Sequence, residues 1–154
     1  MKGIGLVEVL IATAIILITL SGLIAAYNFY LKNALLNLKT LQASLLAEEG
    51  IEALRSLRDT GFATQIVPLG TGTTHYFGWT GSTFTATTSN ILIDGFYERK
   101  FVLDPVYRDS ADKIAGGGTL DPNTKKVTVS VSWRVGNSTT TRSIATYLTN
   151  LFNN

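Results

Sequence analysis

The sequence predicts an α+β protein in which a long N-terminal helix packs, through its second half, on a small C-terminal antiparallel β-sheet. Two patterns carry this prediction. The 23 residues from Val9 to Leu31 contain no charge, and such a run is long enough to cross a membrane as a helix. After Gly61 the chain becomes rich in Thr, Ser and Gly, and apolar residues alternate with polar ones, which is typical of strands. We expect a helix over residues 4–58 and a β-rich head over residues 59–154.

The composition limits the classes of protein to be considered. The chain has 154 residues, a net charge of +2 and no cysteine. So small a charge indicates no polyanionic partner. The lack of cysteine excludes a disulfide framework, a thiolate metal site and a cysteine nucleophile. The length suits one compact head with an extension.

The apolar run Val9–Leu31 is the first element that the sequence defines. As a helix it covers roughly 34 Å, enough for a hydrocarbon core of about 30 Å. The alternatives are a buried core helix and a cleaved secretory signal. A domain of this size rarely buries a helix that is apolar on every face, and the apolar region of a secretory signal has only about 7 to 15 residues. We therefore interpret the run as a membrane span.

Glu8 stands at the beginning of this span. An ionisable group near bilayer hydrocarbon costs up to about 3 kcal/mol on insertion scales, so the first hypothesis is a functional role with a charged partner. The alternative is a carboxylate that is stabilised by the helix dipole, by about 0.3 to 1 kcal/mol, and that reaches the headgroup layer.

The residues around Glu8 favour the functional hypothesis. A basic residue and a Gly precede a short apolar segment that contains the Glu. The stretch is Lys2-Gly3-Ile4-Gly5-Leu6-Val7-Glu8-Val9-Leu10-Ile11-Ala12. It resembles the N-terminal cleavage and methylation motif of type IV prepilins and type II secretion pseudopilins.

The resemblance implies that a prepilin peptidase removes a leader, residues 1–3, by cutting between Gly3 and Ile4. Ile4 would then be the N-methylated first residue, and residues 4–27 would form the transmembrane segment and later the filament core. Glu8 would act in assembly. Its carboxylate would meet the N-terminal amine of a neighbouring subunit, which neutralises two charges that are costly in an apolar core.

The resemblance also implies partners and a location. The partners would be copies of the chain and other pilins, the prepilin peptidase, an inner-membrane assembly platform, and membrane lipid before assembly. The chain would be a single-pass inner (cytoplasmic) membrane protein that enters a cell-surface type IV pilus or a periplasmic pseudopilus. A pilin, a minor pilin and a secretion or competence pseudopilin stay open. A different class also stays open, a bitopic membrane protein whose head binds a ligand without polymerising.

The second half of the helix carries two apolar stripes at helical spacing. We expect the first to face neighbouring subunits and the second to pack on the sheet, whereas one continuous core face with ordinary drift is the alternative. The first stripe is Leu31, Leu35, Leu38, Leu41 and Leu45, and the second is Leu46, Ala47, Gly50, Ala53, Leu54 and Leu57.

The clearest strand is predicted over Lys126–Val135, where valines and Trp133 alternate with polar residues. Gly136-Asn137-Ser138 supplies turn chemistry, and Thr141–Leu148 returns as the second strand of a hairpin. Further extended segments are expected at residues 66–69, 75–79, 82–87, 90–93 and 95–103.

Residues 104–125 are expected to form a long irregular loop, because Pro105, a triple glycine and Pro122 interrupt the alternation. Long loops are often functional. Its carboxylates could gather oxygen ligands for calcium, as the corresponding region does in some pseudopilins. A solvated acidic loop is the more common explanation and no EF-hand spacing is present, so we predict no metal site. The calcium candidates are Asp104, Asp109, Asp112 and Asp121.

The sequence offers little for catalysis. The only histidine, His75, has no nucleophile motif around it, and no phosphate-binding glycine loop precedes a helix. We expect neither an enzyme nor a cofactor. Residues that could contact nucleic acid are scattered over predicted strands, where basic and aromatic residues are usually ordinary sheet faces. They are Tyr76, Phe77, Trp79, Arg99, Lys100, Lys125 and Lys126.

Overall fold

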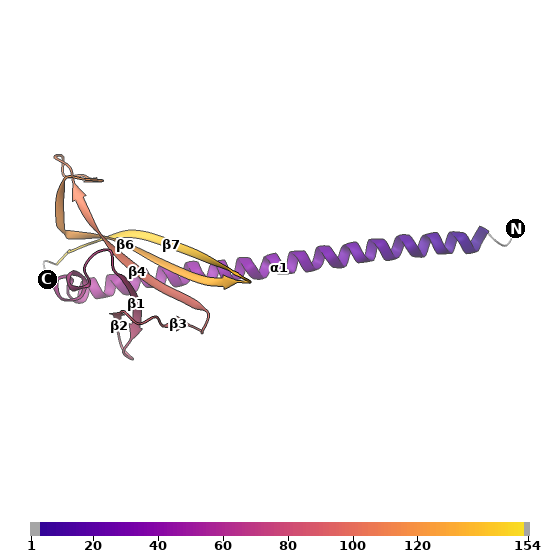
Figure 1. The fold of residues 1–154 in the computed structure, drawn as a ribbon, viewed down its shortest axis with the longest axis horizontal. Coiled ribbons are helices and arrows are strands. Elements are labelled where there is room, and N and C mark those ends of the chain that lie inside the picture. Colours follow the sequence, from indigo (N-terminus) through magenta and orange to yellow (C-terminus); the bar gives the residue numbers. More distant parts are fainter. Residues whose placement is uncertain (1–3, 153–154) are drawn as a thin grey trace. The chain divides into compact units, whose positions relative to one another are not determined.

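The computed structural model describes residues 4–152 (Figure 1). It begins with one long helix, α1 (Ile4–Thr60), which ends two residues later than expected. Contacts within the chain define two units, residues 1–40 and residues 41–154, so the last third of α1 belongs with the sheet. The predicted α+β class, with a long helix and an antiparallel sheet, is confirmed.

Short helical turns and strands follow α1. A π-helical turn (Phe62–Ile66) and a 3-10 turn (Val67–Leu69) lead into the sheet. The strands are β1 (Thr74–Trp79), β2 (Phe84–Thr87), β3 (Leu92–Ile93), β4 (Tyr97–Arg108), β5 (Ile114–Ala115), β6 (Thr119–Val135) and β7 (Ser138–Thr149).

The sheet is antiparallel throughout, in the order β2-β1-β4-β6-β7, with β3 and β5 also paired to β4. The long strands β4, β6 and β7 form its centre and one edge. The predicted hairpin is confirmed as β6–β7, whose closing pair is Val135 and Ser138. Gly136 takes φ 61° in the two-residue turn, a conformation that favours glycine.

The core of the second unit lies between α1 and one face of the sheet. The alternation predicted for β6 is confirmed, since Val127, Val129 and Val131 are fully buried. Small residues on α1 allow a close approach. A Cβ on Gly50 would lie 2.8 Å from Cγ1 of Val129, so only glycine fits there without displacement.

Within residues 41–60, α1 has two distinct faces. The second predicted stripe lies against the sheet: Ala47, Leu54 and Leu57 are buried. Leu41 and Leu45, from the first stripe, are each 56% exposed. The interpretation with two faces is therefore confirmed for this part of the helix. That the exposed leucines face another subunit stays a prediction.

A buried arginine joins the sheet to the helix. Arg99, on β4, is 6% exposed, and its Nη1 donates to the carbonyl oxygen of Leu46 at 3.1 Å and lies 3.2 Å from Oε2 of Glu49. Its guanidinium carbon lies 4.8 Å from the ring centroid of Phe77 and 5.7 Å from that of Phe84. A charge this deep is tolerated because a carboxylate, a carbonyl and two aromatic faces surround it.

Two predictions about the head are wrong. Residues 66–69 are helical, not extended, because Ile66 is fully buried and Pro68 lies early in the 3-10 turn, where its fixed φ suits a helical conformation.

Residues 104–125 are mostly strand rather than an irregular loop. β4 continues to Arg108, and β6 begins at Thr119. The register shifts between Pro105, opposite Lys125, and Val106, opposite Asp121. The prolines that suggested a loop are accommodated at this bulge, where they interrupt no regular ladder.

The Arg99 contacts generate a stability prediction. Glu49→Ala should lower the free energy of unfolding by about 1–2 kcal/mol, because a buried guanidinium loses its carboxylate partner. The matched control is Glu52→Ala on the same helix, whose partner Arg55 is itself exposed. That change should stay within about 0.5 kcal/mol. Denaturant unfolding of the full chain in detergent, followed by tryptophan fluorescence, measures both. An equal loss of free energy of unfolding in the two variants would show that Glu49 does not stabilise the buried Arg99.

Candidate functional site

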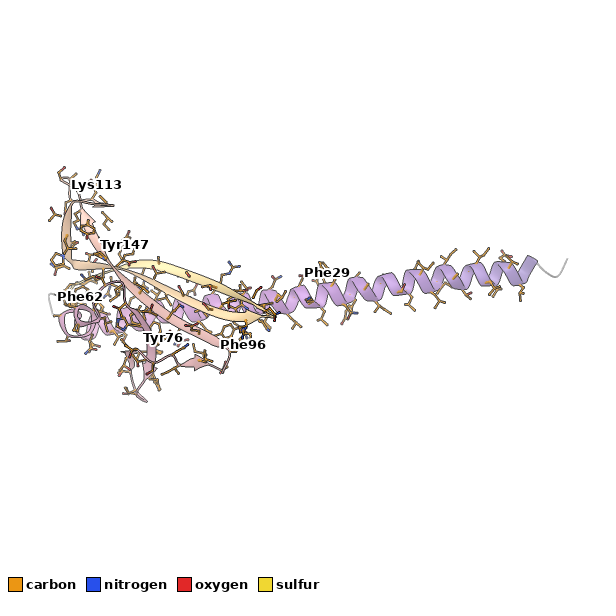
Figure 2. The ribbon with its side chains drawn as sticks, viewed as in Figure 1. Phe29, Phe62, Tyr76, Phe96, Lys113 and Tyr147 are labelled. Atoms are coloured by element: carbon orange, nitrogen blue, oxygen red, sulfur yellow. The ribbon has the colours of Figure 1, made fainter. Side chains whose placement is uncertain are left out.

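The first unit presents an apolar helix surface that nothing in the unit covers. Every side chain from Gly5 to Leu35 is exposed, and Phe29 projects outward from the helix in Figure 2. The helix is long enough and apolar enough to cross a membrane, and no residue of its most apolar window is buried. Leaving a large aliphatic side chain in water costs about 1.5–3 kcal/mol each. This surface therefore requires an apolar surrounding.

The Ser and Thr hydroxyl groups within the apolar run are satisfied inside the helix. Each donates a hydrogen bond to the carbonyl oxygen three residues earlier, which is how such groups avoid an unmet bond in hydrocarbon. The distances are 3.0 Å from Thr13 to Leu10, 2.9 Å from Thr19 to Ile16 and 2.8 Å from Ser21 to Ile18.

Polar and aromatic residues mark the far end of the run. Tyr27 and Tyr30 are exposed, and Lys32 follows them. Tyrosine and lysine favour the interface between hydrocarbon and water. Glu8 lies 22 residues before Tyr30, which is about 33 Å along a helix. A bilayer with Tyr30 at one interface therefore has Glu8 close to the other.

Glu8 itself is exposed and lies past the first helical turn, whose residues include no acid. The dipole effect weakens beyond that turn. Among residues 4–152, the structure gives Glu8 no ion pair, and the basic residue of this range that lies nearest to it along the chain is Lys32, about 36 Å further along the helix. Any charged partner of Glu8 must come from outside the described part of the chain.

The side of the helix that carries Glu8 is lined by small residues. At about 100° per residue, five positions between residues 9 and 29 lie within about 40° of Glu8. Four of them are small, and nothing lies within 4 Å of the place a Cβ would take on Gly22. Small faces allow helices to approach closely in membranes. The five residues are Ala12, Ile15, Thr19, Gly22 and Ala26.

We call these residues with Glu8 the Glu8 face. The opposite side carries Leu6, Leu10, Leu17 and Ile24. The sequence interpretation missed this asymmetry, because it judged the run only by its uniform lack of charge. The signal that finds it is the spacing of the small residues at intervals of seven, three and four positions, which keeps them on one side of a helix.

The processing residues lie at the limit of the structure. Gly3 and the proposed leader, residues 1–3, are outside the described residues, and so is the side chain of Ile4. The backbone of Ile4 begins α1.

Two of the four calcium candidates gather around a guanidinium. Nε of Arg108 donates to Oδ2 of Asp121 at 2.7 Å and lies 3.6 Å from Oδ1 of Asp112. The hydrogen bond from Arg108 is the main reason that the pKa of Asp121 lies below its usual value. Arg108 thus supplies the positive charge for this pair of carboxylates.

The other two candidates have different surroundings. Asp109 closes a turn, since its Oδ1 accepts hydrogen bonds from the backbone N–H groups of Ala111 and Lys113, both at 2.9 Å. Asp104 lies on β4 opposite Lys126. Within residues 4–152 no group of three or more acidic or histidine side chains is placed to hold a metal ion.

Three of the remaining candidates are buried parts of the fold, whereas Trp79 is 61% exposed. His75 is buried, its Nε2 lies 2.9 Å from the carbonyl oxygen of Leu69, and its ring stacks on Phe101 at 5.5 Å. Phe77 and Arg99, named as nucleic-acid candidates, are in the core. Tyr76 and Lys100 face each other across β1 and β4.

Comparisons with known proteins give no relative. No protein-family model matches the chain, and neither a curated protein nor a solved structure matches it. A functional conclusion therefore depends on the helix and the head described above.

Proposed function

We propose that the chain is a structural subunit of a type IV pilus-like filament, a pilin or minor pilin, that polymerises through its N-terminal helix. The observation that carries the proposal is Glu8. It is an exposed carboxylate at one end of a membrane-length apolar helix, on a face of mostly small residues, and it has no ion pair within the described chain.

The apolar surface of residues 5–31 supports assembly as well as membrane insertion. When such a helix leaves lipid, an equally apolar surface must cover it, because each large side chain costs about 1.5–3 kcal/mol in water. Further copies of the same helix provide that surface. The Glu8 face is the side on which a neighbouring helix can approach most closely.

The charge of Glu8 then sets the register between copies. A carboxylate in an apolar filament core is costly unless a positive group meets it. Cleavage between Gly3 and Ile4 would create such a group, the N-terminal amine of a neighbouring subunit, close to the helix end where Glu8 lies. The role is structural rather than catalytic, and it requires no cofactor.

The location follows from this function. Before assembly the chain is a single-pass protein of the cytoplasmic membrane, with its sheet unit outside the cytoplasm. After assembly it is part of a surface pilus or of a periplasmic pseudopilus. The partners are other copies, a prepilin peptidase and an inner-membrane assembly platform.

Processing gives the first test. The mature protein from native membranes should begin at Ile4, with a mass increased by one methyl group, because the amine must be freed at that residue to pair with Glu8. Intact-mass and N-terminal peptide spectrometry measure both features. A mature chain that begins elsewhere would remove the proposed partner of Glu8.

The charge of Glu8 gives the second test. Glu8→Gln keeps the shape of the side chain but loses the charge, so the variant should reach the membrane at normal levels and enter filaments at least about tenfold less. The control is Asp59→Asn, an exposed acid near the end of the same helix. It should leave both levels unchanged. Immunoblots of membrane and sheared-filament fractions give the two amounts. Normal incorporation of Glu8→Gln would favour a membrane-anchored module that does not polymerise.

A further inference from the structure

Strand β7 leaves one side of its backbone unpaired. It forms an edge of the sheet and pairs only with β6. The backbone N–H of Asn150 donates to the carbonyl oxygen of Asn123 at 2.8 Å, so these two residues are a hydrogen-bonded pair. Counting back from Asn150 in steps of two gives the residues of β7 that bond to β6. In an antiparallel pair every second residue directs its N–H and C=O away from its partner. On β7 these residues include Ser143, Ala145 and Tyr147, and no other described group bonds to their backbone.

The β7 edge lacks the features that normally protect an edge strand from pairing with a further strand. β7 has 12 residues with a single charge, Arg142, and no proline. Its pairing with β6 runs without a register shift from end to end. Exposed edge strands that are long and regular accept another strand unless charges, prolines or bulges prevent it.

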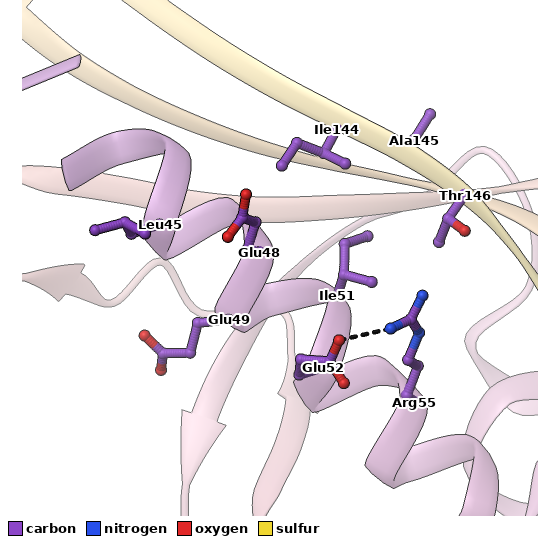
Figure 3. A pocket seen from close by; sticks show the side chains of 9 residues that line it. All are labelled: Leu45, Glu48, Glu49, Ile51, Glu52, Arg55, Ile144, Ala145 and Thr146. Atoms are coloured by element: carbon purple, nitrogen blue, oxygen red, sulfur yellow. Dashed lines mark hydrogen bonds and ion pairs between the residues drawn. The ribbon is translucent and has the colours of Figure 1, made fainter. Parts of the chain in front are cut away.

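A groove runs between this edge and the helix (Figure 3). Its volume is about 510 Å³, and it lies wholly within the second unit. Ile144 and Thr146 line it from the side of β7 that faces the helix. Ala145 also lines it, although its side chain points the opposite way (Figure 3), so Ala145 presents its backbone to the groove.

The helix wall of the groove is acidic. It carries three carboxylates, Glu48, Glu49 and Glu52, and one guanidinium, Arg55. Glu52 pairs with Arg55 at 2.6 Å, and Glu49 pairs with Arg99. Glu48 has no ion pair among the described residues. Leu45 and Ile51 lie between these groups and give the groove an apolar part.

We propose that this groove binds an extended, basic segment of a partner protein, which adds to the sheet as a strand beside β7. The backbone of the segment pairs with Ser143, Ala145 and Tyr147, and its basic side chains face α1. Their aliphatic stems lie on Leu45 and Ile51, and their charged ends meet Glu48 and Glu52. The proposal is independent of the role of Glu8, since it concerns only the second unit.

A peptide of eight residues that alternates lysine and valine, with both ends capped, is the probe. Alternation places the lysines on one face of a strand, as the groove requires. Fluorescence anisotropy measures its binding to the full chain in detergent micelles, and amide hydrogen exchange by NMR locates it. The expected result is saturable binding that slows exchange at Ser143, Ala145 and Tyr147. A peptide that alternates glutamate and valine should bind at least about tenfold more weakly, because its charges repel the helix wall.

Substitutions separate backbone pairing from simple charge attraction. Ala145→Pro removes an N–H that β6 does not use, so it should abolish binding and keep the fold. Ala145→Val keeps that N–H and should bind as the parent does. Glu48→Lys should weaken binding by about fivefold.

A second version of the probe is methylated on alternate backbone nitrogens, so it has no N–H groups to donate to β7 and should not bind. This control requires no change in the protein. Equal binding of the methylated peptide or of the glutamate peptide would overturn the proposal. So would protection of amides away from β7, or full binding by a folded Ala145→Pro variant.

Discussion

A continuous apolar helix surface that carries one carboxylate is the constraint on which the interpretation of this molecule depends. The surface from Gly5 to Leu31 is stable only in lipid or against other apolar helices, and in an apolar filament core Glu8 would be stable only with a positive partner. A membrane alone satisfies the first condition. An assembly in which a neighbouring chain supplies an amine satisfies both. The polar, Thr-rich sheet unit has no such requirement and suits water.

A face of small residues occurs on α1 in both units of the chain. In the second unit, Ala47 and Gly50 bring the helix backbone against β6, and a Cβ on Gly50 would crowd Val129. In the first unit, four of the five residues that share the Glu8 face are also small, but nothing in the structure lies on this face at Gly22. One small face already has its partner, the sheet. The other fits a second helix, which is the basis for assigning it to self-association.

The sequence predicted the elements whose signal is local and periodic. The apolar run and the alternating valines of β6 follow directly from side-chain spacing. It failed at residues 66–69, which were expected to be extended and are helical, and at residues 104–125, whose prolines suggested a loop although most of these residues pair in strands. The burial of Arg99 was also not predicted, because it depends on contacts that are distant in sequence. Its partner Glu49 lies 50 residues away, and no local pattern indicates that this arginine is buried.

Cysteine cross-linking tests the central claim, that copies of the helix meet through the Glu8 face, most directly. The chain contains no cysteine, so each introduced thiol is the only one present. Pairing of Glu8 with Ile4 of a neighbour offsets two copies by four residues, so the thiols are introduced in two co-expressed copies that differ by four positions. Gly22→Cys with Ala26→Cys lies on the Glu8 face, and Leu6→Cys with Leu10→Cys lies on the opposite side. In native membranes under mild oxidation, the account predicts disulfide-linked dimers from the first pair and few or none from the second. Equal cross-linking of both pairs, or cross-linking of the second pair alone, would contradict it.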